Sequence, residues 1–241
     1  MKIFKLDTWA WTTLTLLMGL NSMLASADAP LDDELSQAMA LEGDLQNGKE
    51  VFTTCAACHT TEGWGTEDGR FPQLAGQHRS VIIKQMADIR AGNRDNPEMF
   101  PFAKEEAIGG PQAIADVTAY IATLPMSPTP AHRPGDLSEK DKAKAERMYF
   151  SKCGGCHGVN GEGDDEKFYP RIQGQHYEYL LRQLKWIQTG KRRNADKVMM
   201  RKIERLKPAD FELLADYISR IQPPADLVAE PGWKNPDFWK K

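Results

Sequence analysis

Apolar and polar residues follow each other along most of this chain with the spacing of an α-helix. Between residues 77 and 91 the apolar positions fall on one helical face, occupied by Val81, Ile82, Met86 and Ile89. Gly92 follows directly, and glycine commonly closes a helix. Residues 177–189 repeat the pattern with Tyr179, Leu180, Leu181, Leu184 and Ile187. Strand-type alternation is weak everywhere, so the pattern predicts an all-α fold.

Further helices are predicted at about residues 44–54, 112–124, 138–150 and 208–221. Ser138, with Asp141 three residues later, has the pattern of a capping box at the start of one of them. The helices come in corresponding positions because the sequence repeats with a period of 98 residues: without a gap, Gly76-Gln77-His78 matches Gly174-Gln175-His176. A period near the length of a small domain indicates a duplicated domain rather than a solenoid.

The repeat divides the chain into segments. We predict a first domain at residues 44–124, a proline-rich extended linker at 125–137 and a second domain at 138–221. An N-terminal extension at 28–43 and a C-terminal tail at 222–241 have no repeat partner. Residues 1–27 combine a basic start, an apolar run and the ending Ala25-Ser26-Ala27, which predicts a signal peptide removed by cleavage. The apolar run is shorter than the ~20 residues that a membrane span needs, so we expect no stable membrane insertion.

Composition and charge exclude several classes of protein. The 241 residues have 27% charged side chains and a mean hydropathy of −0.55, which excludes a polytopic membrane protein. The net charge of −3 gives no reason to expect nucleic acid as a partner. It conceals an acidic half, with 7 basic and 16 acidic side chains in residues 28–130, and a basic half in 131–241, with 22 and 17. The basic run that includes Lys191-Arg192-Arg193 is either a solvated helix face or a face for an acidic redox partner.

All four cysteines lie in two copies of one motif, Cys55-x-x-Cys58-His59 and Cys153-x-x-Cys156-His157. This spacing is the attachment signature of haem c, in which two thioethers hold the porphyrin and the histidine ligates the iron. A thioredoxin-like site would need a βαβ context. A zinc site would need to join pairs 98 residues apart, and two disulfides would leave both histidines unexplained. We therefore expect two covalent haem c groups with iron bound by His59 and His157.

A second axial ligand distinguishes an electron carrier from an enzyme with an open iron. In the first domain we predict Met99, because Met86 lies on an apolar helix face and Met126 in the linker. In the second domain Met199 and Met200 are adjacent; we predict Met200, and Met199 stays open. His78 and His176 are alternative ligands, but each starts a predicted helix, where a hydrogen bond to the backbone or to a haem propionate is the simpler role.

With these motifs in place, the chain resembles the diheme class I cytochromes of the cytochrome c4 type. The resemblance covers roughly residues 44–221 and rests on the two haem motifs, on FPQLAGQH at 71–78 and YPRIQGQH at 169–176, and on the closing helices. It implies two tandem class I cytochrome c domains, each wrapped around one covalent haem and related by a pseudo-two-fold. It also implies His/Met ligation of both irons, with the carbonyls of Pro72 and Pro170 orienting the histidines.

These observations predict a soluble periplasmic diheme cytochrome that carries single electrons by outer-sphere transfer and is not itself an enzyme. Its donor would be a quinol-oxidising complex or a dehydrogenase, and its acceptor a terminal oxidase or reductase. An alternative is a dedicated cytochrome subunit of a periplasmic dehydrogenase that acts on sulfur compounds or carries flavin. A diheme peroxidase-type enzyme is the third hypothesis, and it would need an open or specially ligated iron. The aromatic tail, with Trp233, Phe238 and Trp239, either docks on a partner or covers the chain's own surface.

Overall fold

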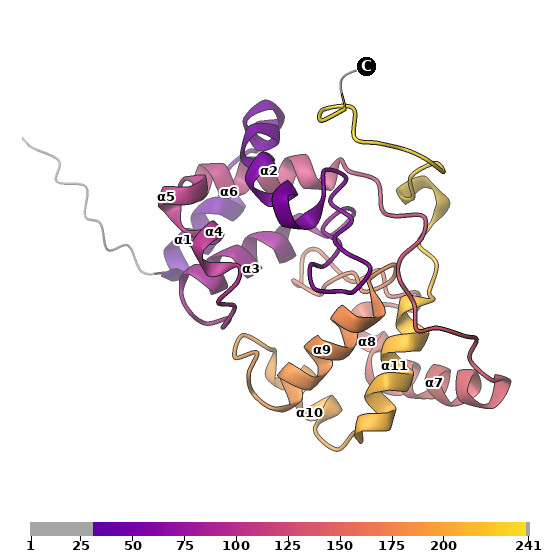
Figure 1. Cartoon of the computed structure of the whole chain (residues 1–241). Helices are drawn as coiled ribbons and strands as arrows, with labels where there is room; N and C mark the ends of the chain where they lie inside the picture. Colours follow the sequence, from indigo (N-terminus) through magenta and orange to yellow (C-terminus); the bar gives the residue numbers. More distant parts are fainter. Residues whose placement is uncertain (1–30, 240–241) are drawn as a thin grey trace, which may run out of the picture.

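A computed structural model describes residues 31–239, and the predicted signal peptide at residues 1–27 lies outside them. Within the described range every regular element is a helix, and the bridges that join extended segments are isolated. Figure 1 shows two helical bodies, α1–α6 in the upper part and α7–α11 in the lower part. The all-α prediction with two tandem domains is confirmed.

The first body is built around the contact between its long second helix and its last helix. Its helices are α1 (Leu31–Ala40), α2 (Leu45–His59), α3 (Arg79–Arg90), α4 (Phe100–Ala103), α5 (Glu105–Ile108) and α6 (Pro111–Ala122). Helix α2 packs against α6, and α1 covers α6 and α3. Phe52, Ile83, Ile114 and Ile121 are buried at these contacts. Arg79 ties the N-terminal extension to this body by donating from Nη2 to the carbonyls of Ala38 at 3.0 Å and Leu41 at 2.8 Å.

The second body repeats this plan with shorter pieces. Its elements are α7 (Glu139–Lys152), α8 (Gly154–His157), α9 (Tyr177–Gln188), α10 (Lys197–Ile203), α11 (Pro208–Ser219) and the 3-10 turn η1 (Ala225–Leu227). Helix α11 packs against α9 and α7 around the buried side chains of Tyr149, Phe211 and Leu214. Ser138 caps α7 by accepting from the backbone N–H of Asp141 at 3.1 Å, as its position in the sequence predicts.

The two haem motifs differ in backbone structure. We predict a first helix ending near residue 54, but α2 continues through the whole motif to His59. In the second motif the helix breaks at Cys153, and the short α8 carries the remaining residues. The residues between the cysteines give the reason, because Ala56-Ala57 favours helix whereas Gly154-Gly155 costs about 1 kcal/mol per residue relative to alanine.

A pseudo-symmetric polar interface joins the two bodies. His78 donates from Nε2 to the carbonyl of Glu162, and His176 donates from Nε2 to the carbonyl of Trp64, each at 2.7 Å. The two bonds are related by the 98-residue shift. Gln77 and Gln175 add a second matched pair: each side chain exchanges two hydrogen bonds with the backbone of the other body, at Arg171 and Gln73 respectively. Because each contact recurs at the equivalent positions of the other body, the two bodies are related by a pseudo-two-fold axis.

The C-terminal tail returns from the second body to the first. Its backbone pairs with the linker, where Met126 donates to the carbonyl of Leu227 at 2.7 Å and accepts from Ala229 at 2.9 Å. Further on, the ring of Trp233 packs on that of Trp64 at 5.8 Å and Phe238 meets Phe52 edge-on at 6.0 Å. Figure 1 shows this segment running back past the linker toward α2. Of the two roles considered for the aromatic tail, the structure supports the cover over the chain's own surface.

No helix between residues 31 and 239 has both the length and the apolar character needed to cross a membrane.

We expect the tail to be anchored by Asn235, which is 1% exposed and donates from Nδ2 to the carbonyl of Thr61 at 2.7 Å and to the Tyr120 hydroxyl at 3.0 Å. Asn235→Ala leaves the carbonyl of the half-buried Thr61 without this donor and should lower the free energy of unfolding by about 1–3 kcal/mol. Chemical denaturation of the haem-loaded protein measures the change, with Glu230→Ala at an exposed tail position as the control. Equal stability of both variants would show that the tail is not held at Asn235.

Candidate functional site

Each histidine of the two motifs is held by a hydrogen bond from one ring nitrogen. Nδ1 of His59 lies 2.9 Å from the carbonyl oxygen of Pro72, and Nδ1 of His157 lies 3.0 Å from that of Pro170. A carbonyl oxygen only accepts, so Nδ1 carries the proton and Nε2 keeps a free lone pair. Both rings are buried, with 6% and 8% exposure. This is the orientation in which an imidazole ligates a metal through Nε2, and it is the one implied for both prolines by the resemblance.

The loop that carries each proline is shaped by glycine. Gly65 donates to the carbonyl of His59 at 2.9 Å and has φ +73°, and Gly163 does the same to His157 with φ +75°. A side-chain carbon at Gly65 would lie 2.2 Å from the carbonyl oxygen of Phe71, so no larger residue fits there. The recurrence of these glycines in the repeat is therefore a requirement of the turn that presents the proline carbonyl.

The surroundings of His59 and His157 favour the uncharged form of each imidazole. Burial lowers the pKa of His59 and of His157, the bond to the proline carbonyl opposes that shift, and the charge of Arg94 or Arg192 lowers the pKa a little further. Burial also raises the pKa of the Cys55 thiol to about 12 and that of Cys153 to about 11. Both pockets thus favour uncharged sulfur, which is the state of a thioether, and uncharged imidazole, which is the form that binds iron.

Apolar side chains complete both sites. In the first domain Cys55, Trp64, Leu74 and Met99 pack, partly buried, against the core. In the second, Ile172, Met199 and Met200 do so beside the buried Cys153. The side chains of each set come from the motif, from the proline loop and from a segment beyond the next long helix. The residues present fit a haem: two thiols, a fixed imidazole, a methionine and an apolar wall. The two cysteine pairs belong to separate bodies, so they do not form one zinc site.

The methionines fall into two groups. Met86, at 7% exposure, belongs to the core face of α3, and Met126, at 2%, is buried at the interface between the domains with its sulfur 4.0 Å from Nη1 of Arg171. Met99 lies in the turn that leads into α4. Met199 and Met200 both lie on α10 and both contact the second core. Met99 and Met200 remain our predicted axial ligands, with Met199 the alternative.

The alternative histidine ligands are occupied elsewhere. His78 and His176 each donate from Nε2 to a carbonyl across the domain interface. Nδ1 of His176 also accepts from the backbone N–H of Ala131 at 3.1 Å. Of the two roles weighed for them, the structure shows the hydrogen bond to the backbone. The sequence signal that could have revealed their place is the strict recurrence of a polar Gly-Gln-His triplet at the start of two helices, because a duplicated polar triplet fits an interface between the duplicates.

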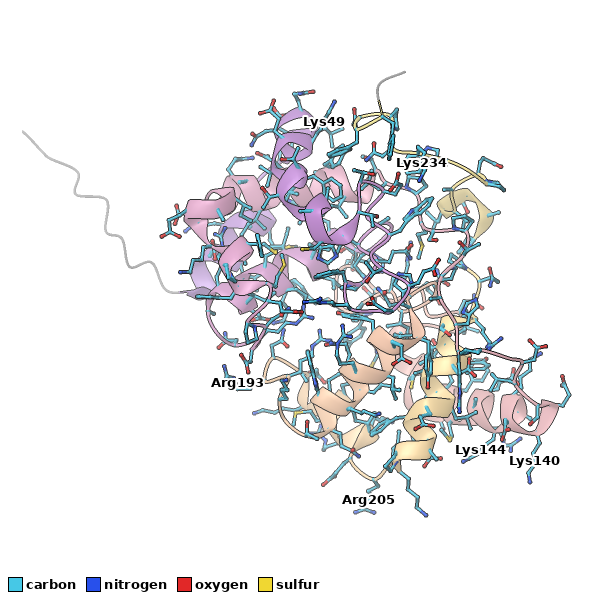
Figure 2. The ribbon with its side chains drawn as sticks, in the orientation of Figure 1. Lys49, Lys140, Lys144, Arg193, Arg205 and Lys234 are labelled. Carbon is cyan, nitrogen blue, oxygen red and sulfur yellow. The ribbon has the colours of Figure 1, made fainter. Side chains whose placement is uncertain are left out.

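Two arginines of the basic run also bond to the first domain. Arg193 is exposed and Arg192 is half-buried, and the docking role of the run stays a prediction. Arg192 donates across the interface to Gln85 Oε1 at 3.0 Å, and Arg193 donates to the carbonyl of Gly92 in the first domain. Figure 2 shows Arg193 at the level where the two bodies meet. Sequence proximity placed both in a basic run, but the tertiary fold turns them toward the other domain.

Comparisons with known proteins agree with this geometry. A family model described as cytochrome c matches residues 45–125 and 143–222. Cytochrome c4 from Azotobacter vinelandii is 33% identical over 195 residues, covering 74% of this chain and 90% of that protein. The crystal structure of reduced recombinant cytochrome c4 from Pseudomonas stutzeri aligns with a TM-score of 0.63 at 28% identity, over 75% of this chain and 100% of that one. A protein named thiosulfate dehydrogenase electron acceptor, from Stutzerimonas stutzeri, is 28% identical over 80% of this chain and 94% of its own length.

We predict that Met99→Ala removes the sulfur ligand of the first iron. The sulfur-to-iron absorption band of the oxidised protein should lose about half its intensity, and one of the two irons should become high-spin. Met86→Leu, in the same domain, serves as the matched control and should leave the band unchanged. A full band in Met99→Ala would contradict this ligation.

The adjacent pair in the second domain is tested in the same way. Met200→Ala should remove about half of the band, whereas Met199→Ala should retain it. The reverse result would assign the iron to Met199, and absorption and magnetic spectra of both variants decide between them.

Proposed function

The chain belongs to the cytochrome c family, and on that premise we propose that it is a periplasmic diheme electron carrier that exchanges single electrons with other redox proteins by outer-sphere transfer. Its two tandem domains carry two covalent haem c groups. When bound, each haem iron alternates between the ferrous and ferric states and so takes up or releases one electron. The observation that carries the proposal is that both domains hold the histidine of their haem motif in the same way, by a bond to a proline carbonyl.

The chain's own residues account for rapid transfer. The Pro72 and Pro170 carbonyls hold the imidazoles of His59 and His157 in one orientation. Cys55, Cys58, Cys153 and Cys156 would hold the porphyrins by thioethers, and Met99 and Met200 would close the remaining axial positions. Fixed ligands keep the geometry similar in both oxidation states, so little reorganisation opposes each transfer. The leader at residues 1–27 supports export to the periplasm.

The second domain offers the surface that suits an acidic partner. Phe150 and Val198 are exposed, at 48% and 44%. The Phe150 ring lies against Gly154, inside the haem motif, because a side-chain carbon there would be 3.5 Å from it. The charges of Lys152 and Lys202 both act on the Cys153 thiol. We define these four side chains, Phe150, Lys152, Val198 and Lys202, as the Cys153 surface.

The first domain shares only half of this surface. The exposed Phe100 and Lys104 take the places of Val198 and Lys202, but the buried Phe52 and the uncharged Thr54 take those of Phe150 and Lys152. Arg70, near Cys58, forms an ion pair with Glu98 at 2.6 Å. The tail also reaches the residues after the motif, where Trp239 donates from Nε1 to Glu62 Oε1 at 3.2 Å. We therefore propose that an acidic redox partner docks at the Cys153 surface, because complementary charge steers short-lived encounters.

Charge reversal tests this docking surface. Lys202→Glu should lower the second-order rate constant of electron transfer from an acidic redox protein by about tenfold at low ionic strength and flatten its salt dependence. Lys140→Glu makes the same change in net charge at the far end of α7, as Figure 2 shows, and should have a much smaller effect. Equal effects of the two variants, measured by stopped-flow mixing, would show that net charge alone guides the partner.

A second candidate function is the electron-accepting subunit of a thiosulfate-oxidising or related dehydrogenase. It is favoured by the similarity to the thiosulfate dehydrogenase electron acceptor, which spans 94% of that relative. In that case a dehydrogenase would reduce this chain directly rather than through a mobile pool.

Affinity purification of the tagged protein from its native periplasm separates the two functions. A dehydrogenase retained in constant stoichiometry through gel filtration would establish the subunit role. Recovery of the chain alone, together with rapid reduction by more than one donor, would establish the mobile carrier.

A further inference from the structure

The turn that follows the first haem motif has an unusual backbone. Thr60 comes directly after His59 and adopts φ +64° and ψ 161°. This region is open to glycine but costly for a residue with a branched side chain. Its repeat counterpart, Gly158, has nearly the same backbone, with φ +80° and ψ 171°. The first domain thus holds a threonine in a conformation that suits the glycine of the second, so its surroundings must keep it there.

The C-terminal tail, which Figure 1 shows returning toward α2, binds this turn from the outside. Asn235 donates from Nδ2 to the carbonyl of Thr61 at 2.7 Å. Trp239 donates from Nε1 to Thr61 Oγ1 at 3.3 Å and to Glu62 Oε1 at 3.2 Å. Nζ of Lys234 lies 3.8 Å from the same carboxylate oxygen, and Glu62 is 5% exposed beneath these contacts. The tail therefore holds both residues that follow Thr60.

The same turn is bonded to the elements that orient His59. The carbonyl of His59 accepts from the backbone N–H of Gly65 at 2.9 Å, which closes the turn onto the motif. The carbonyl of Gly63 accepts from the N–H of Leu74 at 2.7 Å, in the loop that begins at Pro72. Because the Pro72 carbonyl accepts the hydrogen bond from Nδ1 of His59, a movement of the turn would shift both partners of that bond.

Within residues 31–239 the second domain has no such cover. Val159 and Asn160, the counterparts of Thr61 and Glu62, are both exposed, Val159 at 62%. Gly158 needs no external support, because glycine reaches this conformation without strain. Threonine and tail contacts therefore occur together in the first domain, whereas glycine and exposure occur together in the second.

We propose that residues 233–239 of the tail form a clamp that holds the Thr60 turn in place and so positions His59 at the first haem, with Asn235 as a positioning residue. The clamp keeps water away from the residues that follow His59, and a site without water favours ferrous iron, which carries the smaller charge. It thereby gives the first haem a higher reduction potential than the turn would support alone. The inference rests on the proposed ligation of the first iron by His59, and it is independent of the identity of any redox partner.

Redox titration of the holoprotein tests the clamp. Asn235→Ala removes the donor of the Thr61 carbonyl, so the turn loosens, water reaches His59, and the reduction equilibrium constant of the first haem should fall by about tenfold. The equilibrium constant of the second haem should stay as it is in the unaltered protein. Paramagnetic NMR of the haem methyl groups during the titration follows the two haems separately. Glu230→Ala, at an exposed tail position before the clamp, is the matched control and should change neither haem.

Rescue at Thr60 separates positioning from simple packing. In Thr60→Gly the turn keeps its conformation without strain, so the addition of Asn235→Ala to that variant should lower the equilibrium constant of the first haem much less than it does in the unaltered chain. A tail that only stabilises the fold would lower the free energy of unfolding equally in both backgrounds and leave both potentials unchanged.

The clamp would be overturned by a shift of neither haem, by an equal shift of both, or by a shift that Thr60→Gly does not reduce. If Asn235→Ala does not fold, Trp239→Phe decides the question, because it removes the indole donor from Thr61 and Glu62 at an exposed ring. In each of these outcomes low-spin spectra of both haems would leave the proposed electron carrier intact, whereas high-spin iron in the unaltered protein would contradict the carrier itself.

Discussion

The bond between each motif histidine and a proline carbonyl is the contact on which the rest of the structure depends. It fixes the tautomer and direction of His59 and His157, and so it fixes which nitrogen faces the metal. To place the carbonyl there, the chain must turn back within about a dozen residues of the motif, and Gly65 and Gly163 make that turn possible through their positive φ. The apolar walls, the methionine segments and the closing helices then pack around a ligand whose position is already set.

Duplication of this unit created a second requirement, a surface on which the copies meet. The same repeated Gly-Gln-His triplet serves both copies: His78 and His176 each reach a carbonyl of the other domain, and Gln77 and Gln175 each bind the backbone of the other. The interface is polar and is satisfied through directional bonds, so it specifies one relative orientation. That orientation brings Arg94 and Arg192 together, which neither domain would do alone.

The differences between the copies carry the functional asymmetry. The tail covers the first domain beside Trp64 and Phe52, whereas Phe150 and Val198 in the second domain stay exposed next to lysines. Tyr179 stands opposite a valine in the repeat. A carrier with two identical haems and two identical faces would have no preferred direction of exchange, whereas these inequalities give each haem its own surroundings and each domain its own surface.

Much of this protein is determined by local sequence alone. The helical spacing predicted the all-α fold, and the two Cys-x-x-Cys-His motifs with the 98-residue period predicted two haem domains, because covalent attachment and a histidine ligand need only neighbouring residues. The ends of the helices were predicted less accurately than the fold class. The helix of the first motif continues to His59, since Ala56-Ala57 does not interrupt it. The choice between Met199 and Met200 is also beyond local pattern, since both lie on one short helix against the same core. The roles of His78, of Arg192 and of the tail could only be decided by the tertiary structure. Each of these segments finds its partner 84 or more residues away or in the other domain, and sequence periodicity contains no information on which surfaces of two domains will face each other.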